Sequence, residues 1–166
     1  MSESIHDNIK HALKTADSLY HRLVLLVGES GSGKTQTLQA VADDVGTSVI
    51  NVNLLLSTEL LELSTKRRAL RLTSLLDDAL ADCAPPLMLD NLEMLFAIQL
   101  RQDPLRLLQE ISRNQVVLAS WNGKYEASKL LYATPDHPEY RCYEPVDTPI
   151  ITMSGINSLD KSTNSQ

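Results

Sequence analysis

The chain has 166 residues, of which 43% are hydrophobic and 22% are charged, and its formal net charge is −6. This length and composition are typical of one globular domain that needs no disulfide or structural metal. The acidic balance argues against general affinity for nucleic acid, and the two cysteines, Cys83 and Cys142, form no metal-ligand pattern. The first residues lack a signal sequence, and no apolar run approaches the roughly 20 residues of a membrane span. We therefore expect a cytoplasmic protein with no membrane contact.

The first third of the chain alternates between two kinds of apolar pattern. One-sided spacing predicts a helix over residues 4–20, and the uniformly apolar run 23–27 predicts a parallel strand buried on both faces. A second helix is expected over 34–44, closed by Gly46, and a second strand over 48–52. The order is therefore helix, strand, helix, strand.

The same alternation continues through the remainder of the chain. Residues 54–82 are expected to be mostly helical, with a break near Ser64-Thr65, and Pro85-Pro86 ends that helix. A third strand is expected over 87–90 and a largely helical segment over 91–112, with a break near Asp103-Pro104. The last expected elements are a strand over 115–119, a helix over 124–132 and a short strand over 140–143.

Strands that alternate with helices in this way predict an α/β fold with helices on both faces of a parallel sheet. We expect a three-layer fold with a central parallel five-stranded sheet. The domain is expected over residues 1–150, and residues 151–166, which are rich in Ser, Asn and Thr, are expected to form a disordered tail. Ligands of such sheets bind at the carboxyl ends of the strands.

The segment after the first predicted strand matches the phosphate-binding pattern G-x-x-x-x-G-K-[ST] in full. Glycines allow the backbone to approach phosphates, successive amides form an anion-binding nest, and the following helix adds its positive N-terminus. Lys34 is expected to bind the β- and γ-phosphates, and Thr35 to ligate Mg²⁺. The sequence therefore predicts a three-layer P-loop NTPase fold. Its ATP site is expected to be formed by Gly28, Glu29, Ser30, Gly31, Ser32, Gly33, Lys34, Thr35 and Gln36.

A carboxylate follows the third predicted strand and resembles that of a Walker B motif. Asp90 is expected to hold Mg²⁺ together with Thr35; the alternative is that it caps the next helix, with Glu93 completing a capping box. Many related ATPases carry Glu directly after this Asp, whereas this chain has Asn91. Glu93 is therefore the candidate base that activates water, and Asn91 can orient that water without accepting its proton.

Polar residues also follow the fourth predicted strand. Ser120 and Asn122 are candidates to contact the γ-phosphate or the attacking water. The alternative is a simple turn, since Asn122-Gly123 is a strong turn dipeptide. We expect Trp121, the single tryptophan, to pack in the core.

Basic residues form a cluster within the predicted helical segment 54–82. The cluster would oppose the dipole of a helix that began at Thr65, so either the helix begins earlier or the cluster binds a partner such as DNA or an acidic protein surface. A solvated charged face is the third possibility. The cluster comprises Lys66, Arg67, Arg68 and Arg71, and candidates for an arginine that acts on a neighbouring subunit's nucleotide are Arg101, Arg106, Arg113 and Arg141.

The phosphate loop, the acidic third strand and the polar-ended fourth strand together resemble those of AAA+ ATPases over roughly residues 3–145. The resemblance implies that the fourth strand separates the first and third strands. The chain departs from AAA+ proteins in two ways. It has Asp90-Asn91 in place of an Asp-Glu pair, and no helical lid is expected after residue 150.

More closely, the chain resembles the BrxF family of type 3 BREX phage-defence systems. The resemblance rests on the size, on the phosphate loop and on the stretches Leu89-Asp90-Asn91-Leu92-Glu93-Met94-Leu95-Phe96 and Leu118-Ala119-Ser120-Trp121-Asn122-Gly123. It implies an antiviral role and assembly either with itself or with other defence proteins.

Three functions are compatible with these features. The first is an ATPase subunit whose turnover is weak or depends on a partner that supplies an arginine. The second is a module that binds ATP and changes conformation without turnover, which Asn91 favours. The third is a small-molecule kinase, which is weakened by the absence of an acidic acceptor clamp after the second strand, where the chain has Asn51-Val52-Asn53.

Overall fold

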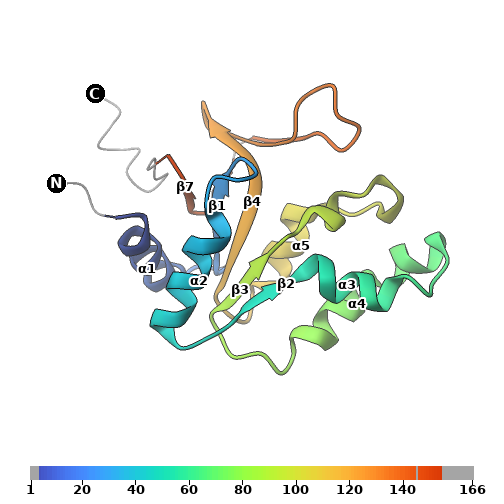
Figure 1. The fold of residues 1–166 in the computed structure, drawn as a ribbon, viewed down its shortest axis with the longest axis horizontal. Coiled ribbons are helices and arrows are strands. Elements are labelled where there is room, and N and C mark those ends of the chain that lie inside the picture. Colours follow the sequence, from blue (N-terminus) through green and yellow to red (C-terminus); the bar gives the residue numbers. More distant parts are fainter. Residues whose placement is uncertain (1–3, 145, 155–166) are drawn as a thin grey trace.

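The computed structural model describes residues 4–144 and 146–154, apart from the side chain of Thr65. Its centre is a sheet of five parallel strands in the order β2-β3-β4-β1-β7 (Figure 1). These strands are β1 (Leu23–Gly28), β2 (Val49–Asn51), β3 (Leu87–Asp90), β4 (Val117–Glu126) and β7 (Ile150–Thr152). The α/β class and the five-stranded parallel sheet are confirmed, and β4 separates β1 from β3 as expected.

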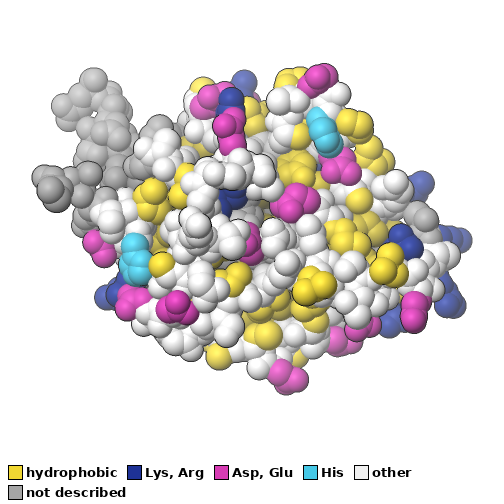
Figure 2. All heavy atoms as spheres, in the orientation of Figure 1, with side chains coloured by type: hydrophobic (Ala, Val, Ile, Leu, Met, Phe, Trp, Pro, Cys, Tyr) yellow, Lys and Arg dark blue, Asp and Glu magenta, His cyan; other side chains and the backbone are white. Residues whose placement is uncertain are grey.

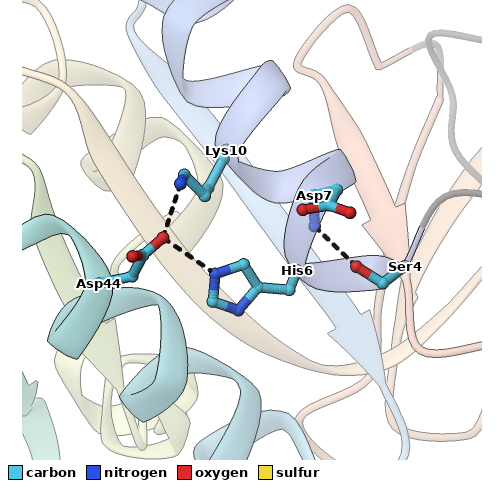
Figure 3. A network of polar contacts seen from close by, with 5 residues as sticks. All are labelled: Ser4, His6, Asp7, Lys10 and Asp44. Carbon is cyan, nitrogen blue, oxygen red and sulfur yellow. Dashed lines mark hydrogen bonds and ion pairs between the residues drawn. The ribbon is translucent and has the colours of Figure 1, made fainter.

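The helices α1 (Ile5–Ala16) and α2 (Lys34–Val45) cover one face of the sheet. Ser4 caps α1 by accepting a hydrogen bond from the Asp7 amide, and Gly46 ends α2 in the left-handed conformation. Figure 3 shows a contact that ties the two helices: Asp44 of α2 accepts hydrogen bonds from Lys10 and His6 of α1 at 2.6 and 3.2 Å. The packing of α2 in this layer fixes where the phosphate loop ends, since α2 begins at Lys34.

The opposite face is covered by a larger layer. It contains the helices α3 (Val52–Leu60), α4 (Thr65–Leu80) and α5 (Pro104–Ile111) and the short 3-10 helices η1 (Glu93–Phe96) and η2 (Ile98–Leu100). Side chains of β1 alternate between the layers, since Leu23, Leu25 and Val27 face this one and Val24 and Leu26 face α1 and α2. The alternation produces the expected three-layer core.

The segment before α5 differs from the prediction. Residues 91–103 contain only η1 and η2 rather than a long helix, because Asn91 and Arg101 adopt left-handed backbone conformations with φ of 56° and 51°. Helix α5 does begin at Asp103-Pro104, where the Asp103 side chain accepts a hydrogen bond from the Arg106 amide. The predicted break near Ser64-Thr65 is also confirmed, since Ser64 caps α4.

The helix predicted over 124–132 is wrong. Strand β4 continues to Glu126 and pairs antiparallel with β5 (Lys129–Tyr132), which in turn pairs with β6 (Arg141–Tyr143). Figure 1 shows the β4 tip extending past the phosphate loop. The predicted strand over 140–143 exists as β6, but it belongs to this antiparallel extension, and β7 is the fifth strand of the parallel sheet.

Strand β7 crosses the expected domain boundary at residue 150, because Ile151 and Thr152 pair with β1. The remainder of the expected tail from residue 155 lies outside the described residues. Within residues 4–144 and 146–154, no helix combines the length and hydropathy that a membrane span requires.

Candidate functional site

The phosphate loop connects β1 to α2 at the carboxyl end of the sheet. Gly33 has φ of 96°, a left-handed conformation that a side chain would strain, and it allows α2 to begin at Lys34. The Lys34 ammonium donates hydrogen bonds to the carbonyls of Gly28 and Glu29 at 2.9 and 2.8 Å. The lysine is thus folded back on its own loop, and its side chain is buried.

Asp90 lies at the end of β3 and accepts two short hydrogen bonds. Thr35 Oγ1 donates to one carboxylate oxygen at 2.7 Å, and Ser120 Oγ donates to the other at 2.6 Å. These contacts join the phosphate loop, β3 and β4 through one buried carboxylate. The box-like cap predicted with Glu93 does not form, because the residue after Asp90 turns left-handed and no long helix follows.

Glu93 also lies close to Asp90, because the chain turns between the two residues. The left-handed Asn91 turns the chain after β3, and Glu93 then begins η1. Its two carboxylate oxygens accept hydrogen bonds from Asn53 Nδ2 at 3.2 Å and from Asn122 Nδ2 at 2.8 Å. Glu93, three residues after Asp90, therefore lines the same cavity as Asp90.

The charges of the site influence one another. Burial raises the pKa of Glu93, an effect that the Asn53 hydrogen bond opposes and the nearby Asp90 carboxylate adds to. Burial lowers the pKa of Lys34, whereas Asp90 and Glu93 act in the opposite direction. A cation and two carboxyl groups thus share one partly desolvated space, where added positive charge near the acids would be stabilised.

A cavity of about 450 Å³ brings these groups together. It is lined by Ser30, Gly31, Gly33, Lys34, Thr35, Gln36, Asp90, Asn91, Glu93 and Asn122. Most of the predicted site residues therefore meet in one space. Ser120 contacts it only through Asp90, and Gly28, Glu29 and Ser32 instead line a neighbouring hollow, where Lys124 lies 3.6 Å from Glu29.

The simple turn that was the alternative at Asn122-Gly123 does not form, because β4 continues through Gly123 to Glu126. A Cβ at Gly123 would lie 1.8 Å from the Leu131 carbonyl oxygen, so the close approach of β5 requires glycine. Ser120 and Asn122 face the acids, while Trp121 packs in the opposite layer and donates to the Leu131 carbonyl at 3.0 Å. The predicted core role of Trp121 is confirmed.

Sequence reasoning missed Asn53 as a site residue. Its side chain donates to Glu93 and accepts from the Met94 amide at 2.8 Å, and its own amide donates to the Asn91 carbonyl at 2.9 Å. The available signal was its place just after β2, the strand next to β3 in the sheet. A polar residue after a neighbouring strand lies at the same edge as the Walker B acid.

The candidate trans-acting arginines lie away from this cavity. Arg113 stacks over the Tyr20 ring, Arg141 donates to the Gln102 carbonyl at 2.9 Å, and Arg106 lies 3.8 Å from Glu110. Among the residues that line the cavity, Lys34 is the only Lys or Arg. That one of Arg101, Arg106, Arg113 and Arg141 acts on a neighbouring subunit's nucleotide stays a prediction.

In the basic cluster, Arg68 has a structural partner. Its guanidinium donates to the Leu63 and Leu61 carbonyls at 2.9 and 3.3 Å, just beyond the end of α3. Lys66, Arg67 and Arg71 are exposed. Helix α4 begins at Thr65, so the cluster lies in its first two turns and opposes its dipole, as the sequence argument anticipated for that start.

Comparisons with known proteins place the chain in one family. No curated protein matches the chain. Among solved structures, it is similar to AMPPCP-bound DnaA from Aquifex aeolicus, with 22% identity and a TM-score of 0.38, over 73% of this chain and 38% of that one. The chain therefore corresponds to less than half of that protein's length. The model of the AAA family, the ATPase family associated with various cellular activities, matches residues 24–118, and the chain belongs to this family.

Proposed function

We propose that the chain binds ATP with Mg²⁺ in the cavity at the carboxyl ends of β1, β3 and β4. The observation that carries the proposal is the convergence of Lys34, Thr35, Asp90 and Glu93 on one space of about 450 Å³. A lysine on the loop and two acids on neighbouring segments are the charges that a metal-bound triphosphate requires. Membership of the AAA family supports the same ligand.

The residues present fit a nucleotide and its metal. Lys34 would exchange its two loop carbonyls for phosphate oxygens, which are stronger acceptors for an ammonium. Thr35 and Asp90, already 2.7 Å apart, would supply hard oxygen ligands to Mg²⁺. No group of three or more His, Cys, Asp or Glu that could hold a metal occurs in the part of the chain that the structure describes. When bound, Mg²⁺ neutralises charge on the phosphates.

The proposed catalytic base is Glu93. Its raised pKa brings it nearer to the range in which a carboxylate accepts a proton from water. Asn122, which contacts both Glu93 and the cavity, would orient the water or the γ-phosphate, and Asn91 lines the same space. Ser120 would hold Asp90 in place by its 2.6 Å hydrogen bond.

The test compares wild type with Lys34→Ala in thermal unfolding with and without MgATP. We expect MgATP to raise the Tm of wild type, and we expect Lys34→Ala to lose that shift because the ammonium is the cation that lines the cavity. Lys14→Ala, an exposed lysine of α1, is the matched control and should keep the wild-type shift. An unchanged shift in Lys34→Ala would contradict the site.

A nucleotide-gated module without turnover is the second candidate. It is favoured by Glu93, both of whose oxygens accept amide hydrogen bonds, so the carboxylate is occupied in this conformation. Phosphate release by wild type, lost in Glu93→Gln, would exclude it. Binding without any release, alone or with partners, would support it.

We further propose that turnover is weak or depends on a partner, and that the chain acts in a cytoplasmic antiviral defence assembly. The resemblance to the BrxF family supports the defence role, and the single cation lining the cavity supports an arginine supplied by a neighbouring subunit. Loss of phage resistance on Lys34→Ala in a host that carries the full system would support this role. Unchanged resistance would contradict it.

DNA contact through the basic cluster of Lys66, Arg67, Arg68 and Arg71 also stays a prediction. Single-stranded and duplex DNA of mixed sequence, titrated at two salt concentrations, would test it. Binding that weakens as salt rises is the expected signature of phosphate contacts.

A further inference from the structure

A second hollow lies between α4 and η2, away from the nucleotide cavity. This α4–η2 groove has a volume of about 710 Å³ and is lined by Lys66, Ala69, Leu70, Gln99, Leu100, Arg101 and Gln102. Leu100 is buried beneath it, whereas Leu70 beside it is 74% exposed. The groove therefore combines an apolar floor with an apolar side chain left in water, an arrangement that marks interaction sites.

The charged residues that line the groove are both cations, Lys66 and Arg101. Arg67 and Arg71 are exposed on the same helix as Lys66. Figure 2 shows Lys and Arg side chains gathered over the α3–α4 end of the molecule, beside hydrophobic ones. The groove is thus locally basic on a chain with a formal net charge of −6.

Two features place these cations where folding alone does not favour them. Lys66 lies in the first turn of α4, where the helix dipole disfavours positive charge. Arg101 has φ of 51°, a left-handed conformation that residues other than Gly, Asn and Asp seldom adopt. Arg101 also ends η2, where its amide donates to the Ile98 carbonyl, and left-handed conformations of residues other than Gly are concentrated at functional sites.

The groove is also held in place by the chain itself. Gln102 Nε2 donates to the Ala69 carbonyl of α4 at 3.3 Å and to the Leu100 carbonyl of η2 at 2.9 Å, so one side chain bridges the two walls. Arg141 of β6 donates to the Gln102 carbonyl at 2.9 Å. A preformed groove loses less entropy on binding than a flexible one.

We propose that the α4–η2 groove binds an acidic segment of a partner protein, with an apolar side chain against Leu70 and Leu100 and carboxylates beside Lys66 and Arg101. Charge complementarity selects this occupant: both rim charges are positive, and the floor is apolar. A nucleic acid would use the cations but would leave the exposed leucine without a matching surface. The proposal does not depend on nucleotide binding.

The test uses a phage-displayed library of random 12-residue peptides, selected on the whole folded chain at low salt. We expect enrichment of sequences that combine Asp or Glu with Leu, Ile or Phe. A synthetic copy of the most enriched peptide is then titrated by fluorescence anisotropy. Because both rim contacts are ionic, we expect the peptide to bind at least about tenfold more weakly to Lys66→Glu and to Arg101→Glu.

Matched variants separate the groove from general surface charge. Leu70→Ser, at a side chain that is 74% exposed, should weaken the peptide severalfold without unfolding the chain. Lys14→Glu on α1 and Leu54→Ser on α3, which lie outside the groove lining, should bind as wild type does. Circular dichroism of each variant confirms that it is folded.

Several outcomes would overturn the proposal. They are the absence of enrichment, enrichment of basic or uncharged peptides, and equal binding to the groove variants and to wild type. Competition by a 20-nucleotide single strand without any acidic peptide binding would assign the surface to nucleic acid. Dimerisation of wild type that Leu70→Ser abolishes would assign it to a second copy of the chain.

Discussion

The nucleotide cavity and the α4–η2 groove differ in whether their binding groups already have partners within the chain. In the cavity, polar groups already have partners within the chain: Lys34 donates to loop carbonyls and Thr35 to Asp90. In the groove, Leu70 and the rim cations stand in solvent. A ligand of the cavity must exchange hydrogen bonds, so its specificity comes from charge and geometry. A ligand of the groove breaks no such bonds, and it gains from ionic contacts with the rim cations and from removing the apolar surface of Leu70 from water.

The largest expected effect is a loss of phosphate release when Glu93 in the cavity is replaced. Glu93→Gln keeps the shape of the side chain but cannot accept a proton, so phosphate release should fall about 10²- to 10⁴-fold if Glu93 is the base. Affinity for a non-hydrolysable ATP analogue should change little. Glu126→Gln, at an exposed glutamate of the β4 tip, is the control and should release phosphate at the wild-type rate.

A turnover rate in Glu93→Gln equal to that of the control would remove Glu93 from the mechanism. Loss of analogue binding would instead show that Glu93 holds the ligand. Single-turnover measurements distinguish these two outcomes, because they separate binding from the chemical step.

The next effect contrasts two leucines of α4. Leu72 is fully buried and Leu70 is 74% exposed, although they are two residues apart. Leu72→Ala should lower the free energy of unfolding by about 2–5 kcal/mol through lost burial and a cavity. Leu70→Ala should change it by less than about 0.5 kcal/mol. Urea unfolding measures both, and an equal loss would show that Leu70 supports the fold rather than an interaction.

The smallest expected effect is a pH dependence of the stability that Glu93 contributes to the fold. Burial raises the pKa of Glu93, so the carboxyl group contributes stability below its ordinary pKa, and this contribution is lost as pH rises through the raised value. Glu93→Gln should therefore unfold at a slightly higher temperature than wild type at neutral pH, and the difference should shrink on acidification. Thermal unfolding between pH 4 and pH 8 tests this; a difference that grows on acidification would reverse the sign.

The same shift predicts an acid limb in turnover. Only the deprotonated carboxyl group of Glu93 accepts a proton. As the pH is lowered, phosphate release should therefore begin to decline at a pH above the ordinary pKa of glutamate.

The phosphate loop and its flanking elements could be predicted because their signals are local. The apolar run before Gly28 and the Gly33-Lys34-Thr35 end fix a strand, a loop and a helix within a short span. Asp90 could be placed because an acid directly after a buried strand lies at the ligand edge of a parallel sheet.

The β4–β5 hairpin could not be predicted for a physical reason. Its turn passes through Ala127 and Ser128 with φ of 50° and 64°, at residues that lack the Gly or Asn signal for such a turn. Its strands gain their stability from distant contacts, including the Tyr132 ring stacked on Phe96. Asn53 was missed for a similar reason, since its contact with Glu93 depends on the order of the strands.

Strand β4 has a mechanical consequence. Ser120 and Asn122 contact the two acids, and four residues later the same strand reaches its turn at Glu126, about 13 Å further at the usual rise of a strand. No flexible joint separates the acids from that tip, because the backbone remains paired with β5 from Gly123 onward. Any movement of the β4 backbone at Asn122 on binding ATP would therefore be carried to the tip, and a fluorophore at Lys129 would detect it outside the cavity.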